Sequence, residues 1–239
     1  MRLLIACERS GVVRDAFLAR GHSAISCDTA PSERPGPHIQ ADVVSVLDWG
    51  WDIIIAHPPC TYLCNSAAWA FSDGPYHQRV RPETLVGAAR RAAREDALRF
   101  VDAIWSAPCA SVCLENPAGC LNTRRPDMPR PQWVQPYQFG DDASKRTGLW
   151  LRGLPPLRPL PDSEQAPPRM VDGRPRWANQ TDTGQNRLSP GADRARLRSQ
   201  TYPGIARAMA EQWGDLILQA EDGDEKRHQQ SNSGGQSGR

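Results

Sequence analysis

The segment Trp51-Asp52-Ile53-Ile54-Ile55-Ala56-His57-Pro58-Pro59-Cys60 carries the clearest structural signal in the sequence. Its short, continuous apolar run predicts a β-strand that is buried on both faces, as in a parallel sheet covered by helices. The two prolines that follow lack backbone N–H donors and have a restricted φ, so they end the strand and stiffen the next loop. The segment therefore predicts a central strand that delivers Cys60 on a rigid loop.

The sequence on both sides of this segment alternates between strand-like and helical patterns. Strands are predicted at residues 2–7, 23–27, 39–41, 51–56, 110–114 and 147–151, and helices at residues 12–20 and 84–107. Strands that alternate with helices of this length are typical of a mostly parallel sheet with helices on both faces. We therefore predict an α/β fold of the Rossmann-like type.

Four regions follow from the change in composition along the chain. Residues 1–151 form the predicted α/β domain, and residues 152–200 form a Pro/Arg-rich irregular arm. Residues 154–176 contain seven prolines, so we expect irregular coil or an extended arm there. A helix over residues 201–220 is expected to pack back on the α/β domain. Residues 221–239 have too few apolar side chains to order themselves and are expected to form a disordered tail.

Composition limits the class of protein. The chain has 239 residues, a formal net charge of +2 and seven cysteines, an odd number that argues against a disulfide framework. No signal peptide or membrane span is recognisable, so we expect a soluble, cytoplasmic protein. Between residues 121 and 200, fourteen Lys and Arg face eight Asp and Glu. This local excess of positive charge suits either a phosphate-bearing partner or a solvated Arg-rich surface.

Chemically active residue types gather where the predicted strands end, which is where parallel sheets bind ligands. Cys60, on a loop stiffened by two prolines, is placed as a nucleophile; the alternative is a small buried core residue, as free Cys often is. Glu115 follows the strand at residues 110–114 and is placed to approach the same ligand; alone, it also fits a surface carboxylate.

The order of these motifs resembles that of the cytosine-C5 DNA methyltransferase family, in the compact form often carried by bacteriophages. The resemblance covers most of residues 1–151 and resumes near residue 200. It rests on a cofactor turn, two acidic residues after strands, a Pro-Cys loop, a Glu-Asn motif, an Arg-containing strand and a returning C-terminal segment. These match Cys7-Glu8-Arg9-Ser10-Gly11, Asp28, Asp42, Pro58-Pro59-Cys60, Glu115-Asn116, Lys145-Arg146-Thr147 and Tyr202-Pro203-Gly204-Ile205-Ala206.

The resemblance implies an enzyme that transfers a methyl group from S-adenosyl-L-methionine to C5 of a pyrimidine, in bacterial or phage-infected cells. It makes Cys60 the thiolate that adds to C6, Glu115 the group that contacts N3 and the exocyclic amine, and Arg146 the cation beside them. Further residues are assigned to the target base and to the cofactor. Those for the base are Pro59, Asn116 and Lys145; those for the cofactor are Cys7, Ser10, Gly11, Asp28, Asp42 and Pro58.

The sequence departs from the family in having no large target-recognition domain, because residues 152–200 are too few and too rich in proline to form one. DNA is the expected partner, and a free pyrimidine nucleotide is the alternative substrate. Three further hypotheses are a non-catalytic nucleic-acid-binding relative, transfer of a group other than methyl, and a metal site. The metal site would use His57, Cys60 and Cys64, with Cys109, Cys113 and Cys120.

Overall fold

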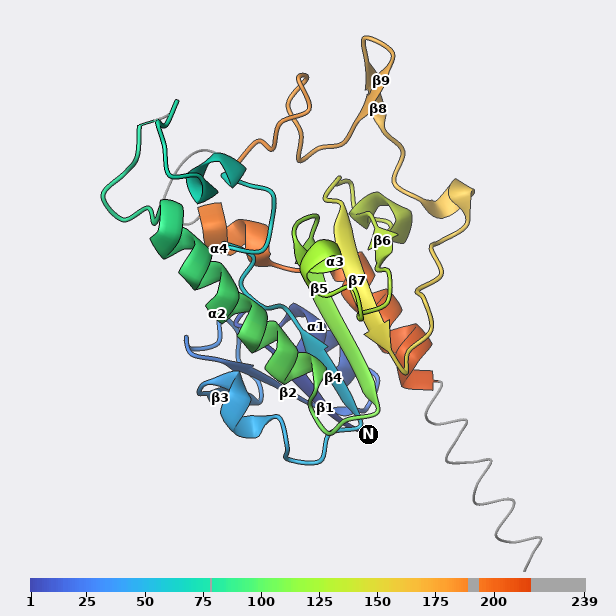
Figure 1. Cartoon of the computed structure of the whole chain (residues 1–239). Helices are drawn as coiled ribbons and strands as arrows, with labels where there is room; N and C mark the ends of the chain where they lie inside the picture. The colour runs from blue at the N-terminus through green and yellow to red at the C-terminus, as the bar shows by residue number, and fades with distance from the viewer. Residues whose placement is uncertain (78, 189–193, 216–239) are drawn as a thin grey trace, which may run out of the picture.

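The computed structural model describes residues 1–77, 79–188 and 194–215. A seven-stranded sheet forms its centre, in the order β3-β2-β1-β4-β5-β7-β6 (Figure 1). The strands are β1 (Arg2–Ala6), β2 (Ser23–Asp28), β3 (His38–Gln40), β4 (Ile53–Ala56), β5 (Ser111–Pro117), β6 (Gln132–Val134) and β7 (Thr147–Arg152). The α-helices are α1 (Val12–Leu18), α2 (Gly87–Trp105), α3 (Leu121–Arg124) and α4 (Arg194–Ser199), and residues 203–215 are also helical.

Strand directions define the type of sheet. β3, β2, β1, β4 and β5 pair in parallel, whereas β7 pairs antiparallel with both β5 and β6. The order 3-2-1-4 with helical crossovers is that of a doubly wound sheet, in which ligands bind beyond the carboxyl ends of the strands. The predicted Rossmann-like α/β fold with a mostly parallel sheet and a small C-terminal lobe is confirmed.

Helices cover both faces of the sheet, which explains why its central strands are apolar throughout. α1 and the helix at residues 203–215 lie on one face, where Phe17 and Trp213 pack with Ile53 and Ile55. α2 lies on the other face and packs there against Ile54 (Figure 1). β4 is fully buried along its whole length. Its position between β1 and β5 fixes where the Pro-Pro-Cys loop begins.

Several predicted boundaries were wrong, and pairing between strands explains the main one. β5 continues to Pro117 instead of ending at Leu114, because β7 pairs with it through Glu115, Asn116 and Pro117. The short β6 was not predicted from the sequence. Coil was expected over residues 154–176, but a hairpin of β8 (Arg169–Val171) and β9 (Arg174–Arg176) forms there, closed by Asp172 and Gly173, which both have positive φ.

The C-terminal region is described as far as residue 215. Ile205, Ala206, Met209 and Trp213 are buried on the sheet, so the helix there contributes to the same core as α1. The rest of the helix predicted to reach residue 220, and the predicted tail at residues 221–239, lie outside the described residues. Among the helices described, none is long and apolar enough to cross a membrane.

A buried arginine on α1 fixes the loop that follows β2. The Arg14 side chain is fully buried; it donates to Ser26 Oγ at 3.2 Å, Ser32 Oγ at 3.0 Å and the Pro35 carbonyl at 2.9 Å. It also forms an ion pair with Asp15 at 2.8 Å. A Cβ at Gly11 would lie 2.5 Å from the guanidinium, so the glycine at this turn makes room for Arg14. The loop after β2 is therefore held from beneath by one side chain.

We expect Arg14→Met to destabilise the protein by about 3 kcal/mol or more, because it removes every hydrogen bond that this fully buried guanidinium makes to Ser26, Ser32 and Pro35. Arg20→Met is the matched control: Arg20 lies just beyond the same helix, and its ion pair with Asp215 is exposed on both sides. Loss of this ion pair is expected to lower the free energy of unfolding by less than about 1 kcal/mol. Denaturant unfolding of both variants measures the difference, and equal midpoints would contradict the structural role given to Arg14.

Candidate active site

Cys60 lies in a single helical turn directly beyond the carboxyl end of β4. The N–H groups of Leu63 and Cys64 both donate to the Cys60 carbonyl at 3.0 Å. Asn116, on β5, is buried and donates from Nδ2 to the Pro58 carbonyl at 3.0 Å. Cys60 itself is exposed. The loop therefore holds the thiol at the surface of the sheet edge, and Asn116 helps to hold the loop there.

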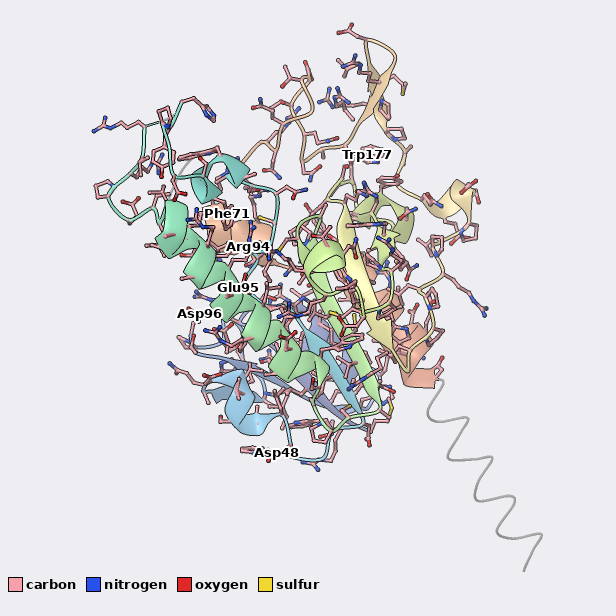
Figure 2. All side chains as sticks on the ribbon, in the orientation of Figure 1. Asp48, Phe71, Arg94, Glu95, Asp96 and Trp177 are labelled. Carbon is pink, nitrogen blue, oxygen red and sulfur yellow. The ribbon has the colours of Figure 1, made fainter. Side chains whose placement is uncertain are left out.

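Arginines of α2 hold the loop from its other side. Arg90 donates to the Thr61 carbonyl at 3.2 Å, and Arg94 donates to the Tyr62 carbonyl at 3.0 Å. The Arg94 guanidinium also lies 3.2 Å from the centre of the Phe71 ring, as Figure 2 shows at the upper end of α2. These contacts fix the backbone of the helical turn that carries Cys60.

A carboxylate, an imidazole and an ammonium group meet beside this loop. Glu115 Oε2 lies 3.4 Å from His57 Nδ1, and the two side chains are only 13% and 7% exposed. Burial by itself raises the pKa of Glu115, but the Lys145 charge and hydrogen bonds from His57 and Thr147 outweigh it and lower the pKa. Glu115 is therefore a carboxylate near neutral pH, held by one cation and two donors.

The electrostatic environment of Cys60 connects it to the same group of residues. Although the residue is exposed as a whole, its thiol is partly desolvated. A hydrogen bond with Cys64, this desolvation and the Glu115 charge raise the pKa of the Cys60 thiol, whereas the Lys145 charge lowers it. The pKa of Cys64 falls to about 5, chiefly through its hydrogen bond with Cys60. The two thiols therefore titrate as a coupled pair, in which loss of a proton is eased at Cys64 and hindered at Cys60. Glu115 and Lys145 both lie close enough to influence it.

A cavity of about 500 Å³ opens at the carboxyl ends of β1, β2 and β3 and reaches the Pro-Pro-Cys loop at Pro59. Of the predicted cofactor residues, Cys7, Asp28 and Asp42 line it. Asp28 accepts from the Ala30 N–H at 2.8 Å and Asp42 from the Val44 N–H at 3.0 Å, each with one carboxylate oxygen. The remaining lining residues are Thr29, Ala41, Val43, Thr61, Tyr62, Ala93, Asp96, Ala97 and Phe100.

The other predicted cofactor residues do not line this cavity. Ser10 is buried, and its hydroxyl donates to Glu8 at 3.2 Å. Glu8 in turn accepts from the N–H groups of Val13 and Arg14, at 2.7 and 3.2 Å, so its carboxylate caps the start of α1. Gly11 packs on the Arg14 side chain, and Pro58 is buried. The turn after β1 therefore places Cys7 at the cavity while Ser10 and Gly11 support the helix.

Lys145 and Arg146, predicted to contact the substrate and to stand beside the thiolate, lie in different surroundings. The Arg146 guanidinium is exposed and lies 4.3 Å from the Trp133 ring centre. Lys145, predicted to contact the substrate, is the cation that lowers the pKa of both Glu115 and Cys60. Its Nζ donates to the Gln200 carbonyl at 3.3 Å. Neighbouring residues of an extended segment point in opposite directions, so only one of the two can face the site.

The sequence predictions missed one site residue and most of the cavity wall. His57 was considered only as a metal ligand, although its place at the end of β4, beside β5, brings it to Glu115. Tyr62, Asp96 and Phe100 line the cavity but carry no motif. Helical spacing places Asp96 and Phe100 on one face of α2, and only the structure shows that this face meets the cavity.

The metal hypothesis receives no support from the arrangement of the cysteines. Cys113 is buried in the core on one face of the sheet, and Cys109 is buried on the opposite face. Within the described residues, no three His, Cys, Asp or Glu side chains are grouped so that they could hold a metal ion.

The β8–β9 hairpin is attached next to the segment that carries Lys145. Trp177, which follows β9, stacks on Tyr137 with ring centres 4.1 Å apart; Figure 2 shows it at the base of the hairpin. Asn179 exchanges two hydrogen bonds of 2.9 Å with the backbone of Ser144. The hairpin itself is exposed, with Met170 62% accessible to solvent. Its arginines are Arg169, Arg174 and Arg176.

Comparisons with known proteins give little beyond the fold. No family model and no curated protein matches the sequence. Among solved structures, the chain is similar to a "putative DNA modification methyltransferase" encoded within a prophage of E. coli, with a TM-score of 0.38 and 14% sequence identity. The match covers 63% of this chain and 46% of that protein, so the chain spans less than half its length. The fold assignment rests on the strand order and directions described above.

Proposed function

We propose that the protein is an S-adenosylmethionine-dependent methyltransferase that methylates C5 of cytosine in DNA through a covalent bond between Cys60 and C6. The observation that carries this proposal is the meeting of Cys60, Glu115 and Lys145 at the sheet edge, next to a cavity lined by Asp28 and Asp42. Such a site combines a nucleophile with charged groups that contact a flat polar ring.

The proposed chemistry follows from the weak nucleophilicity of C5. When the Cys60 thiolate adds to C6, the C5–C6 π electrons shift toward N3 and make C5 enamine-like, so that it can attack an electrophilic methyl group. Glu115 contacts the N3 edge, where negative charge develops, and Lys145 stabilises both the thiolate and that charge. A water molecule acting as base then takes the C5 proton, the C–H electrons form the C5–C6 double bond again, and the bond to Cys60 breaks to release the thiolate. The site would thus return to its starting state after each transfer.

The cavity has the charge expected for a cationic cofactor. Asp28, Asp42 and Asp96 line it, and among the described residues no Lys or Arg does. Such a wall favours a sulfonium nucleoside and disfavours a phosphate-rich dinucleotide. In this proposal Asp28 accepts from ribose hydroxyls and Asp42 from the adenine amine, and Tyr62 and Phe100 offer aromatic surface. When bound there, S-adenosylmethionine supplies the electrophilic methyl group.

Two measurements test the proposal. Calorimetry is expected to show binding of S-adenosylmethionine to the protein, weakened about tenfold or more in Asp28→Ala through the loss of charge-assisted hydrogen bonds. Incubation with DNA followed by mass spectrometry of the nucleosides is expected to give 5-methylcytosine. Cofactor binding without any modified base would indicate a non-catalytic relative, and methylation at an exocyclic nitrogen would overturn the covalent mechanism.

DNA is favoured over a free nucleotide by the β8–β9 hairpin. An exposed two-stranded ribbon with three arginines is suited to phosphate contacts along a groove, and its base is fixed to Ser144, the neighbour of Lys145. Asp182 pairs with Arg169 at 2.6 Å on the exposed surface, a contact that a phosphate can replace. A target base in a duplex would have to be flipped out to reach Cys60.

We expect replacement of Arg169, Arg174 and Arg176 by Gln to weaken DNA binding about tenfold or more. The slope of the logarithm of affinity against the logarithm of salt concentration should fall by the equivalent of about two to three phosphate contacts. Arg20→Gln is the control, since Arg20 lies just beyond α1 and pairs with Asp215 instead of belonging to the hairpin. Fluorescence anisotropy of labelled duplex DNA across a salt series gives both quantities. If the triple variant loses no affinity while cytosine methylation persists, the hairpin does not contact DNA.

A further inference from the structure

His57 is placed on Glu115 by the register of the sheet. β4 and β5 run in parallel with Ala56 opposite Leu114, so the next residues, His57 and Glu115, emerge side by side at the carboxyl edge. The imidazole is 93% buried, and the His57 N–H donates to the Ala6 carbonyl at 2.9 Å, which fixes its backbone. A buried polar ring at this position is not needed to end the strand, because Pro58 and Pro59 already do so.

The direction of the hydrogen bond follows from the charge of Glu115. A carboxylate oxygen can only accept, so the ring nitrogen His57 Nδ1, 3.4 Å away, is the donor. The other ring nitrogen, Nε2, is buried and has no hydrogen-bond partner among the described residues. His57 thus presents its proton-bearing nitrogen to Glu115 and uses neither nitrogen to bind the surrounding fold. The arrangement is that of a carboxylate–imidazole pair.

The chemistry at N3 of cytosine requires a proton. A carboxylate accepts from the exocyclic amine of cytosine, but its other oxygen then faces the lone pair of N3, and two acceptors repel. A proton between them removes this repulsion and neutralises N3 when Cys60 adds to C6. Glu115 is held ionised by Lys145, His57 and Thr147, with burial opposing them, so it has no proton of its own to give near neutral pH. A neighbouring source is needed.

We propose that His57 is the positioning residue that supplies this proton: it protonates Glu115 as Glu115 protonates N3. The Cys60 Sγ–C6 bond forms and the C5–C6 π bond is lost toward N3. The imidazolium form of His57 passes its Nδ1 proton to Glu115, and Glu115 passes that proton on to N3, which leaves a neutral imidazole and an ionised Glu115. Elimination of Cys60 returns the proton along the same path, so no acid is consumed. This inference rests on the proposed function and names a residue that determines its preference for cytosine.

The charged and titratable groups near the pair come from several elements. Lys145 precedes β7, Cys60 lies on the loop after β4, and Cys113 lies on β5 two residues before Glu115; each interacts electrostatically with Glu115. Cys113 is buried. A pH-dependent step contributed by His57 is therefore separable from theirs by replacing His57 alone.

The test is the pH dependence of methyl transfer to DNA in His57→Asn, whose amide can still donate to Glu115 but cannot release a proton. We expect the rate at neutral pH to fall by about tenfold to a hundredfold with little change in KM, and activity to recover only at lower pH, where Glu115 itself is protonated. In a plot of rate against pH, the decline at high pH should therefore begin at a lower pH in His57→Asn than in the wild type. His22→Asn is the matched control, because His22 is also buried, with an unpartnered Nε2, but packs on Phe17 away from the site.

The outcomes separate the two proposals. Wild-type protein that yields no 5-methylcytosine would overturn the proposed function and this inference with it. If the wild type is active and the rate of His57→Asn is lowered by the same factor at every pH, His57 only shapes the site. That result would overturn this inference and leave the proposed function standing. If Asn disturbs the local fold, His57→Gln provides a second amide that does not titrate. A plot of rate against pH that runs parallel to that of the wild type in both variants would likewise overturn this inference.

Discussion

Cys60→Ser is expected to lower the rate of methyl transfer by about three orders of magnitude or more, because a hydroxyl at this position has no base to ionise it and is a far weaker nucleophile than a thiolate. Binding of S-adenosylmethionine is expected to remain, since Pro59 and Thr61 line the cavity whereas Cys60 does not. Single-turnover methylation of DNA, together with calorimetry of the cofactor, measures the two effects separately.

The control for this variant is Cys109→Ser. Cys109 is buried just before β5, where its thiol donates to the Ser111 carbonyl at 3.2 Å, a bond that a serine hydroxyl can also make. Its activity is expected to stay near that of the wild type. If Cys60→Ser retains activity comparable to Cys109→Ser, the reaction does not pass through a covalent bond to Cys60.

Glu115→Gln is expected to reduce methyl transfer by about 10²- to 10⁴-fold, because an amide cannot pass a proton to N3. It is also expected to make Cys60 more reactive toward an alkylating agent. The Glu115 charge raises the pKa of Cys60, so its removal lowers that pKa and increases the thiolate fraction at a given pH. A variant that alkylates faster while it methylates more slowly is the specific signature of this site.

Lys145→Met provides the opposite charge change. The Lys145 ammonium lowers the pKa of Cys60, so its loss should raise that pKa and slow alkylation. Iodoacetamide labelling of Cys60 as a function of pH, followed by peptide mass spectrometry, measures both variants, with Glu164→Gln on the exposed surface as the control. Identical labelling in the Glu115 and Lys145 variants would mean that these two residues do not face Cys60.

The fold was predictable from the sequence to the extent that burial leaves a local pattern. The apolar run at Ile53–Ala56 and the helical spacing of residues 87–105 need no knowledge of their neighbours. β6 and the end of β5 escaped prediction because their strand character comes from pairing with β7 and not from their own composition. The β8–β9 hairpin was hidden by the surrounding prolines, of which Pro175 lies within the two-stranded ribbon itself.

The candidate site was predictable where a residue stands at a strand end and less so where side-chain direction decides. Cys60, Glu115, Asp28 and Asp42 lie at the edge that the strand pattern indicated. The choice between Lys145 and Arg146 depends on which of two neighbours faces inward, and the sequence does not give that. The role proposed for His57 depends on its contact with Glu115, a residue 58 positions away in the chain and on a neighbouring strand. Motifs therefore indicated the candidate nucleophile, whereas the charges around it could be identified only from the structure.

Trapping on DNA that contains 5-fluorocytosine tests the central claim most directly, since fluorine at C5 cannot leave as a proton does and the covalent bond to the enzyme persists. Incubated with S-adenosylmethionine, the wild-type protein is expected to gain the mass of the DNA and of one methyl group, with the attachment mapped to Cys60. An adduct on any other cysteine, or unmodified protein under conditions in which ordinary cytosine is methylated, would contradict the account.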